Sequence, residues 1–195
     1  MVMPMAFLKA LVFVACLMPL GYIGWAFSMD QLGANPIEEV IHQTGDWTLR
    51  FLLITLSLTP LRSLTGSGKW LQFRRMIGLY AFFYATLHLL SYVVLDQFFD
   101  WPEILKDIIK HPYITVGFLA WLLMIPLAVT STKGMMKRLG RRWKQLHRLV
   151  YVIAILGIIH FTWLVKADYQ EPLIYGLILS LLLGLRWFKR TPVGK

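Results

Sequence analysis

Residues 143–164 read WKQLHRLVYVIAILGIIHFTWL. The stretch begins beside a basic cluster, then becomes almost entirely apolar, and carries two histidines, His147 and His160, thirteen residues apart. A run of about 20 mostly apolar residues is long enough to cross a bilayer as a helix. Ionisable side chains inside such helices are costly and usually face the interior of a bundle. The stretch therefore predicts a membrane-spanning helix whose histidines have a specific role.

The composition of the whole chain is that of a membrane protein. Of its 195 residues 57% are hydrophobic and only 15% are charged. The net charge of +10 does not indicate nucleic-acid binding, because the basic residues lie between apolar runs, as in membrane proteins. We therefore expect contact with membrane lipid and none with nucleic acid. The one cysteine, Cys16, excludes an intramolecular disulfide and a cysteine-based metal site.

Apolar segments recur along the chain at lengths that suit a bilayer. The predicted spans are residues 7–27, 47–64, 76–95, 113–131, 146–165 and 172–189. The first apolar run continues to Phe27, which favours a retained helix over a cleaved signal peptide. No linker or repeat divides the segments. The sequence thus predicts an all-α membrane protein, a six-transmembrane-helix bundle that forms one domain over residues 1–195.

Charges are distributed unevenly between the segments. Sixteen of the twenty Lys and Arg residues fall near the N-terminus, in loops 62–75 and 132–148, and in the tail from Arg186. These segments lie on one side of the predicted membrane. All ten acidic residues and the four remaining basic ones, Lys166 and Asp168 among them, lie in the segments on the opposite side. The positive-inside rule then places both termini of a multi-pass membrane protein in the cytoplasm.

Two of the segments predicted outside the membrane are long enough to have a structure of their own. Residues 28–46, with Gly33 and Pro36, are expected to form a loop. In the loop 96–112 the sequence WPEILKDIIKHP has apolar residues at helical spacing, which predicts a short amphipathic helix. Such a helix lies at the membrane interface or docks a partner.

His88 and His160 are predicted to lie at the same depth. The third span leaves the inner side near Arg75 and the fifth near His147, and each histidine follows thirteen residues later. At ~1.5 Å per residue, both lie ~20 Å along their helices. Facing imidazoles at one depth suit the axial positions of one heme, although hydrogen bonds between helices are the alternative. Zinc is disfavoured because no carboxylate or cysteine lies at that depth.

Four further residues are candidates for cofactor contact. His147, at the inner edge, is a ligand of a second heme, a contact for a quinone or flavin, or an interfacial polar residue. Arg50, near the outer end of the second span, pairs with a heme propionate or snorkels to the interface. Arg74 and Arg75 meet an anionic cofactor or anchor the positive side.

Three stretches carry a family resemblance. LQFRRMIGLYAFFYATLHLLSY (71–92), RRWKQLHRLVYVIAILGIIHFTW (141–163) and GDWTLRFLLITLSLTPLR (45–62) resemble the MsrQ family, the heme-binding membrane subunits of the bacterial methionine sulfoxide reductase system. The resemblance covers residues 7 to 190 with the same six-helix plan. That family is similar to the membrane domain of ferric reductases and NADPH oxidases, which hold two stacked hemes through four histidines.

The resemblance implies roles for individual residues. His88 and His160 match the outer histidine pair, and His147 matches the inner histidine of the fifth helix. The inner histidine of the third helix is expected fourteen residues before His88, where this chain has Arg74, which is not a normal heme ligand. The resemblance therefore implies one heme b at the outer pair and leaves a second heme at His147 as an alternative.

The resemblance also implies an electron conduit. Electrons would come from the quinone pool or a flavin reductase, with FMN as a further cofactor. They would pass to MsrP, a periplasmic molybdopterin-containing methionine sulfoxide reductase that repairs oxidised proteins. The chain has no G-x-G-x-x-G after a strand and no evident nucleophile–base pair, so we expect an electron-transfer subunit that does not itself act on methionine sulfoxide. The alternatives are a stand-alone transmembrane ferric or quinone reductase, and a non-heme transporter or scaffold.

Overall fold

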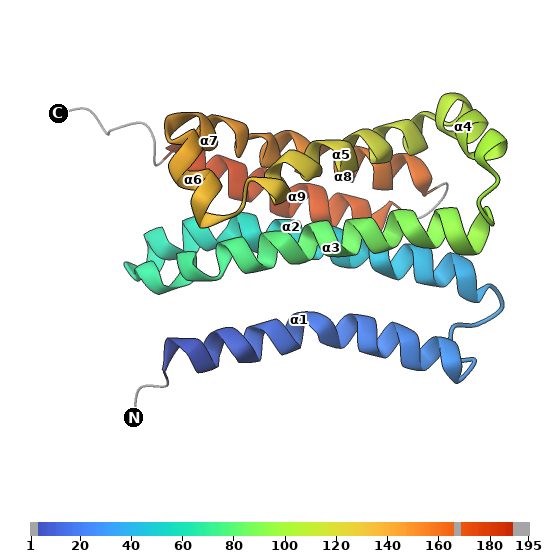
Figure 1. Ribbon diagram of the computed structural model, residues 1–195, viewed down its shortest axis with the longest axis horizontal. Helices are drawn as coiled ribbons and strands as arrows, with labels where there is room; N and C mark the ends of the chain where they lie inside the picture. The colour runs from blue at the N-terminus through green and yellow to red at the C-terminus, as the bar shows by residue number, and fades with distance from the viewer. Residues whose placement is uncertain (1–3, 166–168, 189–195) are drawn as a thin grey trace.

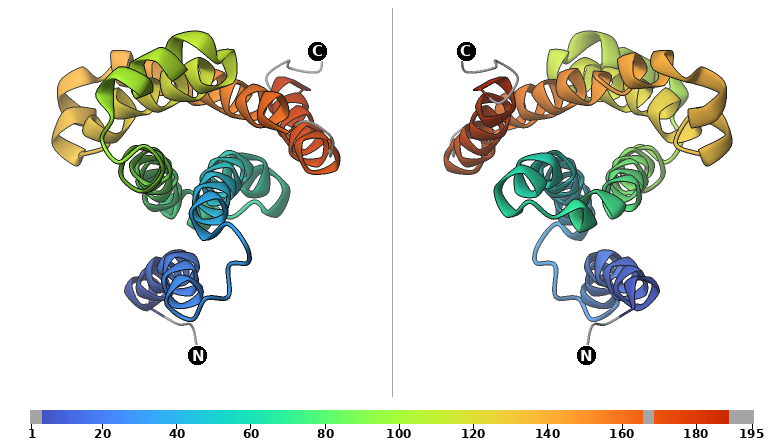
Figure 2. Two further views of the ribbon diagram at one scale, coloured as in Figure 1. Left: turned by 90° about the vertical axis from the view of Figure 1, so that its right-hand side faces the viewer. Right: turned by 90° about the vertical axis from the view of Figure 1, so that its left-hand side faces the viewer.

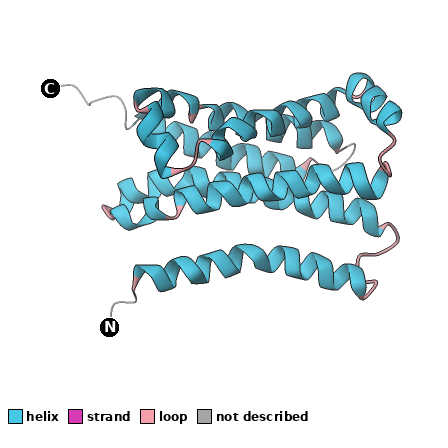
Figure 3. Cartoon of the chain, viewed as in Figure 1, coloured by secondary structure: helices cyan, strands magenta, loops and turns pink. Residues whose placement is uncertain are grey.

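The computed structural model describes residues 4–165 and 169–188, and every regular element in these ranges is helical (Figures 1 and 3). The long helices are α1 (Met5–Ser28), α2 (Pro36–Thr65), α3 (Arg74–Leu90), α5 (Pro112–Val129), α8 (Leu149–Leu164) and α9 (Gln170–Phe188). Shorter segments join them: η1 (Gly68–Gln72), the π-helix η2 (Ser91–Asp96), α4 (Trp101–Lys110), α6 (Lys133–Leu139) and α7 (Arg141–Leu146). The predicted all-α class is confirmed.

The long helices form three layers. Seen along the helices, α1 lies on one side of the α2–α3 pair, and α5, α8 and α9 lie on the other (Figure 2). Helix α2 is central, because it contacts α1, α3, α8 and α9. Its side chains Phe51, Leu52 and Leu56 belong to the buried core.

Within residues 4–165 and 169–188, four helical stretches are long and apolar enough to cross a membrane. They are Met5–Ser28, Arg74–Asp96, Pro112–Val129 and Arg141–Leu164. The chain is therefore a multi-pass membrane protein. Helices α2 and α9, with 30 and 19 residues, are also long, but α2 carries Arg50 and Arg62. A central helix tolerates polar residues because much of its surface faces protein rather than lipid. The count of six spans stays a prediction.

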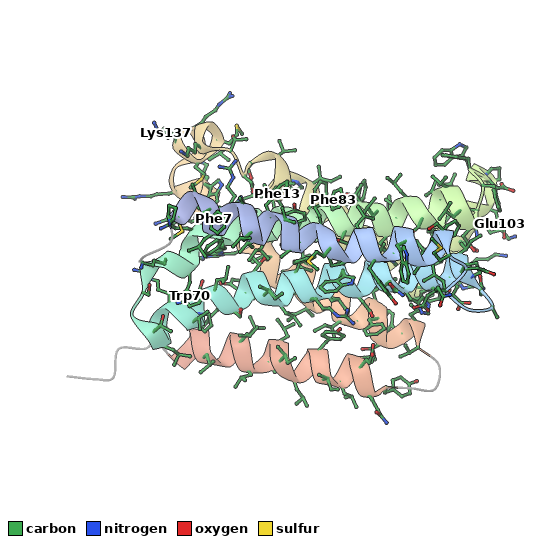
Figure 4. All side chains as sticks on the ribbon, turned by 90° about the horizontal axis from the view of Figure 1, so that it is seen from below. Phe7, Phe13, Trp70, Phe83, Glu103 and Lys137 are labelled. Carbon is green, nitrogen blue, oxygen red and sulfur yellow. The ribbon has the colours of Figure 1, made fainter. Side chains whose placement is uncertain are left out.

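The two ends of the bundle differ in charge. Helix α1 begins and α9 ends at the end that carries α6 and α7, whereas α4 lies at the other end (Figure 1). Lys137 and Glu103 mark these opposite ends in Figure 4. We call the end that carries α6 and α7 the basic end, and the end that carries α4 the acidic end. Lys166, Asp168 and the basic tail from residue 189 lie outside the described residues, and the membrane side that each end faces stays a prediction.

The expected loop over residues 28–46 is shorter in the structure. Helix α2 begins at Pro36, so the expected loop over 28–46 ends at Asn35. The reason is local: the Asn35 side chain accepts a hydrogen bond from the Glu38 backbone N–H at 3.4 Å. Pro36 stands at the first helical position, and Glu38 and Glu39 are in the first turn. An Asn cap, a proline at the first position and early acidic residues all favour helix initiation.

The short amphipathic helix predicted in the loop 96–112 is confirmed as α4. The Asp100 side chain caps it by accepting from the Glu103 backbone N–H at 3.2 Å. Trp101, Leu105 and Ile109 follow one another at intervals of four residues and are 58%, 60% and 81% exposed. Residues at this spacing share one face of a helix. An exposed apolar face of this kind suits the membrane interface.

A tyrosine hydroxyl attaches α1 to the bundle. The Tyr84 side chain is fully buried, and its hydroxyl accepts from the Leu20 backbone N–H at 3.0 Å and donates to the Cys16 carbonyl at 2.9 Å. Residues 16 and 20 would ordinarily bond to each other within an α-helix. The hydroxyl is thus inserted into the hydrogen-bond ladder of α1 beside Pro19, at a point where helices commonly bend.

Replacing Tyr84 with phenylalanine tests this attachment. Tyr84→Phe keeps the ring but removes the hydroxyl that bonds to the Leu20 N–H and the Cys16 carbonyl of α1, and we expect it to lower stability by about 1–3 kcal/mol. Thermal unfolding in a mild detergent measures the change. Tyr22→Phe is the matched control, because Tyr22 is 57% exposed on the same helix. Equal unfolding temperatures for the two variants would contradict the role of the hydroxyl.

Candidate functional site

Two imidazole rings face each other across the interior of the bundle. His88 comes from α3 and His160 from α8. Their ring centroids are 6.0 Å apart and the ring planes make an angle of 76°. The structure therefore brings together the two histidines that the sequence placed at one depth. They lie nearer the acidic end, since His160 is in the last turns of α8.

Each ring is fixed by a backbone carbonyl of a neighbouring helix. Nδ1 of His88 lies 2.9 Å from the Ile41 carbonyl oxygen in α2, and Nδ1 of His160 lies 2.7 Å from the Tyr113 carbonyl oxygen in α5. A carbonyl oxygen only accepts hydrogen bonds, so each Nδ1 carries the proton and donates it. In the neutral imidazole with the proton on Nδ1, Nε2 keeps its lone pair, which is the state that binds a metal.

A glycine makes room for each ring. Gly45 follows Ile41 by one helical turn, and Gly117 follows Tyr113 by one turn. A Cβ atom at Gly45 would lie 3.2 Å from His88 Nδ1, and one at Gly117 would lie 2.7 Å from His160 Nδ1. A side chain at either position would crowd the ring against which the glycine packs. Each histidine ring is thus supported in the same way, by a backbone carbonyl and by a glycine one helical turn later.

The paired histidines suit a metal ion that is already held by a planar macrocycle and needs only two further ligands from the protein. No cluster of three or more His, Cys, Asp or Glu side chains among the described residues could hold a bare metal ion. A tetrahedral zinc site would need such a cluster. A metal between two imidazoles has nitrogens about 2 Å away on each side, which puts the ring centres about 6 Å apart. The observed separation of 6.0 Å fits heme, whose iron needs two axial ligands from the protein.

His147 has a different environment at the basic end. Its ring stacks on Trp143 with centroids 4.0 Å apart, and its Nε2 lies 3.0 Å from the Thr130 hydroxyl. The Trp143 Nε1–H donates to the Thr130 carbonyl at 2.9 Å. The structure therefore pairs His147 with a tryptophan and a hydroxyl rather than with a second imidazole. Its place as a ligand of a second heme stays a prediction.

The three candidate arginines have different environments in the structure. Arg50 donates through Nε to the Tyr175 hydroxyl at 2.9 Å and lies 3.2 Å from an Asp46 carboxylate oxygen, above the Trp47 ring. Arg75 is exposed in the first turn of α3. Arg74 is one of the residues that line a cavity at the basic end. Pairing of Arg50 with a propionate stays a prediction, and its observed partners come from within the chain.

Sequence reasoning missed the supports of the histidine pair. Gly45 and Gly117 carry no chemical group, and the carbonyls of Ile41 and Tyr113 belong to residues of ordinary type. For Gly117 the available signal was a glycine inside an apolar helix, which usually has a packing or functional reason, whereas Gly45 fell in the expected loop 28–46. Which histidine each glycine supports depends on helix pairing, which one sequence does not give.

Comparison with known proteins agrees with this architecture. Residues 44–158 match the family model described as "Ferric reductase like transmembrane component". A protein of Xanthomonas oryzae pv. oryzae (strain MAFF 311018) named "Protein-methionine-sulfoxide reductase heme-binding subunit MsrQ" is 54% identical over 188 residues, which cover 93% of this chain and 86% of that protein. A protein of the same name from Herminiimonas arsenicoxydans is 52% identical over 191 residues, 94% of this chain and 88% of that protein. The chain therefore belongs to the MsrQ family and contains a ferric reductase-like transmembrane component.

Proposed function

We propose that this chain is a heme-binding electron-transfer subunit of the bacterial inner membrane. It would pass electrons to a periplasmic molybdopterin-containing methionine sulfoxide reductase, MsrP, that repairs oxidised proteins. The observation that carries the proposal is the facing pair His88 and His160, with each Nδ1 on a backbone carbonyl and each Nε2 left for a metal. The relatives' name, which calls them heme-binding subunits of protein-methionine-sulfoxide reductase, supports it.

The chain's own groups would set the properties of the site. A heme b bound there supplies a carrier for one electron at a time. The carbonyls of Ile41 and Tyr113 hold the two imidazoles in one orientation and increase the basicity of each Nε2. Burial among apolar helices limits access of water to the iron ligands, which is a second way in which a protein tunes a heme.

The distance of the histidine pair from the basic end limits how electrons from that end could reach it. Reducing a sulfoxide to a thioether and water takes two electrons and two protons, so two single-electron passages serve one turnover. His88 lies fourteen residues after Arg74 in α3, which is ~20 Å along the helix. A donor at the basic end therefore needs a second carrier on the way, and FMN or a second heme near His147 would supply it. We propose the quinone pool or a flavin reductase as that donor.

Absorption spectra of the purified protein test the central part of the proposal. We expect a b-type spectrum that shifts on reduction with dithionite, with one heme per chain by the pyridine hemochrome assay. His88→Ala and His160→Ala should each abolish it, because each removes one axial ligand. An unchanged heme content in His147→Ala would exclude a second heme there.

A colourless wild-type protein after expression with ample heme would contradict the heme proposal and favour a transporter or scaffold. Co-purification of a molybdenum protein separates the proposed subunit from a stand-alone ferric or quinone reductase. A heme protein that reduces ferric chelates or quinones but never captures such a partner would favour the stand-alone enzyme.

Alanine substitutions at Gly45 and Gly117 should reduce heme binding to different extents. In Gly117→Ala the new Cβ would lie 2.7 Å from His160 Nδ1, so the ring must move and we expect most of the heme to be lost. Gly45→Ala, with its closest ring atoms at 3.2 Å, should lose less. Gly21→Ala in α1 is the control, since no atom lies within 4 Å of its Cβ position. The heme-to-protein ratio of each variant measures the effect. A wild-type ratio in Gly117→Ala would contradict the claim that this glycine is needed to leave space for the His160 ring.

Labelling of introduced cysteines determines which end of the bundle faces the cytoplasm. In a Cys16→Ser background, Lys137→Cys places a thiol at the basic end and Lys110→Cys places one at the acidic end; both positions are exposed. We expect a membrane-impermeant maleimide to label Lys110→Cys in intact spheroplasts and Lys137→Cys only after lysis, because basic segments stay in the cytoplasm. The reverse pattern would overturn the proposed direction of electron flow.

A further inference from the structure

Helices α3 and α5 are joined by side-chain contacts above and below the level of the histidine pair. His88 lies in α3, and the ring of His160 is held by the carbonyl of Tyr113, the second residue of α5. On the side toward the basic end, the Trp121 Nε1–H of α5 donates to the Thr86 hydroxyl of α3 at 3.1 Å. A contact on the other side of the histidines would complete the control of the spacing between the two helices.

That second contact passes through the carboxylate of Asp107 in α4. Its Oδ2 accepts from the Tyr92 hydroxyl at 3.1 Å. Its Oδ1 lies 3.6 Å from Nε2 of His111, a distance at which a protonated imidazole forms an ion pair. Tyr92 belongs to η2, which continues α3, and His111 immediately precedes α5. One carboxylate, with its side chain only 19% exposed, therefore joins η2, α4 and the start of α5.

The contact reaches both histidines through short connections. Tyr92 follows His88 by four residues, which is about one helical turn. On the other side, the rings of His111 and Tyr113 have centroids 5.7 Å apart, and those of Tyr113 and His160 are 6.3 Å apart. A shift of α5 away from α3 would therefore move the carbonyl that holds one imidazole relative to the helix that carries the other.

We propose that Asp107 is a positioning residue for the heme ligands. By joining Tyr92 to His111, it holds α3 and α5 at the spacing that places the two imidazoles 6.0 Å apart. The inference rests on the proposed function, because it treats these imidazoles as the axial ligands. It gives α4 a role beyond its exposed apolar face: the helix carries the carboxylate that connects the two sides of the site.

The remaining contacts predict a change in geometry rather than a loss of the fold when this carboxylate is removed. The bond between Trp121 and Thr86 does not involve α4. The Thr115 hydroxyl of α5 also donates to the Ile108 carbonyl of α4, so the two helices stay attached. We therefore expect variants of Asp107 to bind heme, but to hold it less firmly and with altered ring orientation.

Heme transfer from the detergent-purified protein to apomyoglobin measures how firmly the heme is held. Asp107→Ala removes both contacts, and we expect the rate of heme loss to rise about three- to tenfold. Asp107→Asn should have a smaller effect, because its amide oxygen can still accept from the Tyr92 hydroxyl. Glu103→Gln is the matched control, since Glu103 is a half-exposed carboxylate of the same helix that pairs with Lys106 of α4.

Electron paramagnetic resonance of the same samples separates positioning from a general loss of stability. The anisotropy of the low-spin signal depends on the angle between the two imidazole planes, so its g values should change in Asp107→Ala and stay unchanged in Glu103→Gln. Tyr92→Phe should change both readouts in the same direction. The double variant of Asp107→Ala and Tyr92→Phe should be no worse than Asp107→Ala alone, because both side chains act through one contact.

The outcomes separate this proposal from the proposed function. Wild-type heme loss and wild-type g values in Asp107→Ala would overturn the positioning role and leave the heme-binding function standing. Faster heme loss with unchanged g values would also overturn it, because a merely structural role gives that result. If Asp107→Ala does not elute as a folded protein, Tyr92→Phe decides by the same criteria. A colourless wild-type protein would overturn the proposed function and this inference together.

Discussion

Each of the two facing imidazoles is held by a carbonyl oxygen inside a helix, and this constraint sets how the helices pair. The carbonyl of Ile41 lies in α2 and holds the ring of α3, whereas the carbonyl of Tyr113 lies in α5 and holds the ring of α8. A carbonyl in a helix already accepts from the N–H four residues later. An imidazole can share it only if that later residue leaves space, and in both helices it is a glycine. The pairs α2–α3 and α5–α8 therefore pack closely at the level of the histidines.

The bundle separates two kinds of chemistry along its length. Neutral imidazoles with free Nε2 atoms lie nearer the acidic end, in surroundings that suit a heme. Arginines without carboxylate partners line a cavity at the basic end.

The sequence was informative where local pattern decides structure. Apolar runs located the long helices, amphipathic spacing located α4, and counting residues from the basic loops placed His88 and His160 at one depth. The start of α2 was missed although Asn35, Pro36 and Glu38 carried the capping signal, because attention to hydropathy alone favours the apolar part of a helix. Tyr84 and Gly117 act on segments far away in the chain. Their roles depend on which helices are neighbours, and one sequence without its relatives does not contain that information.

Electron paramagnetic resonance of the oxidised, purified protein tests the central claim most directly, because the signal reports the axial ligands of ferric heme. Two imidazoles from His88 and His160 predict a low-spin signal, strongly anisotropic because the ring planes are 76° apart. The signal should disappear in either histidine-to-alanine variant. A high-spin signal in the wild type, or a low-spin signal that survives both substitutions, would contradict the account.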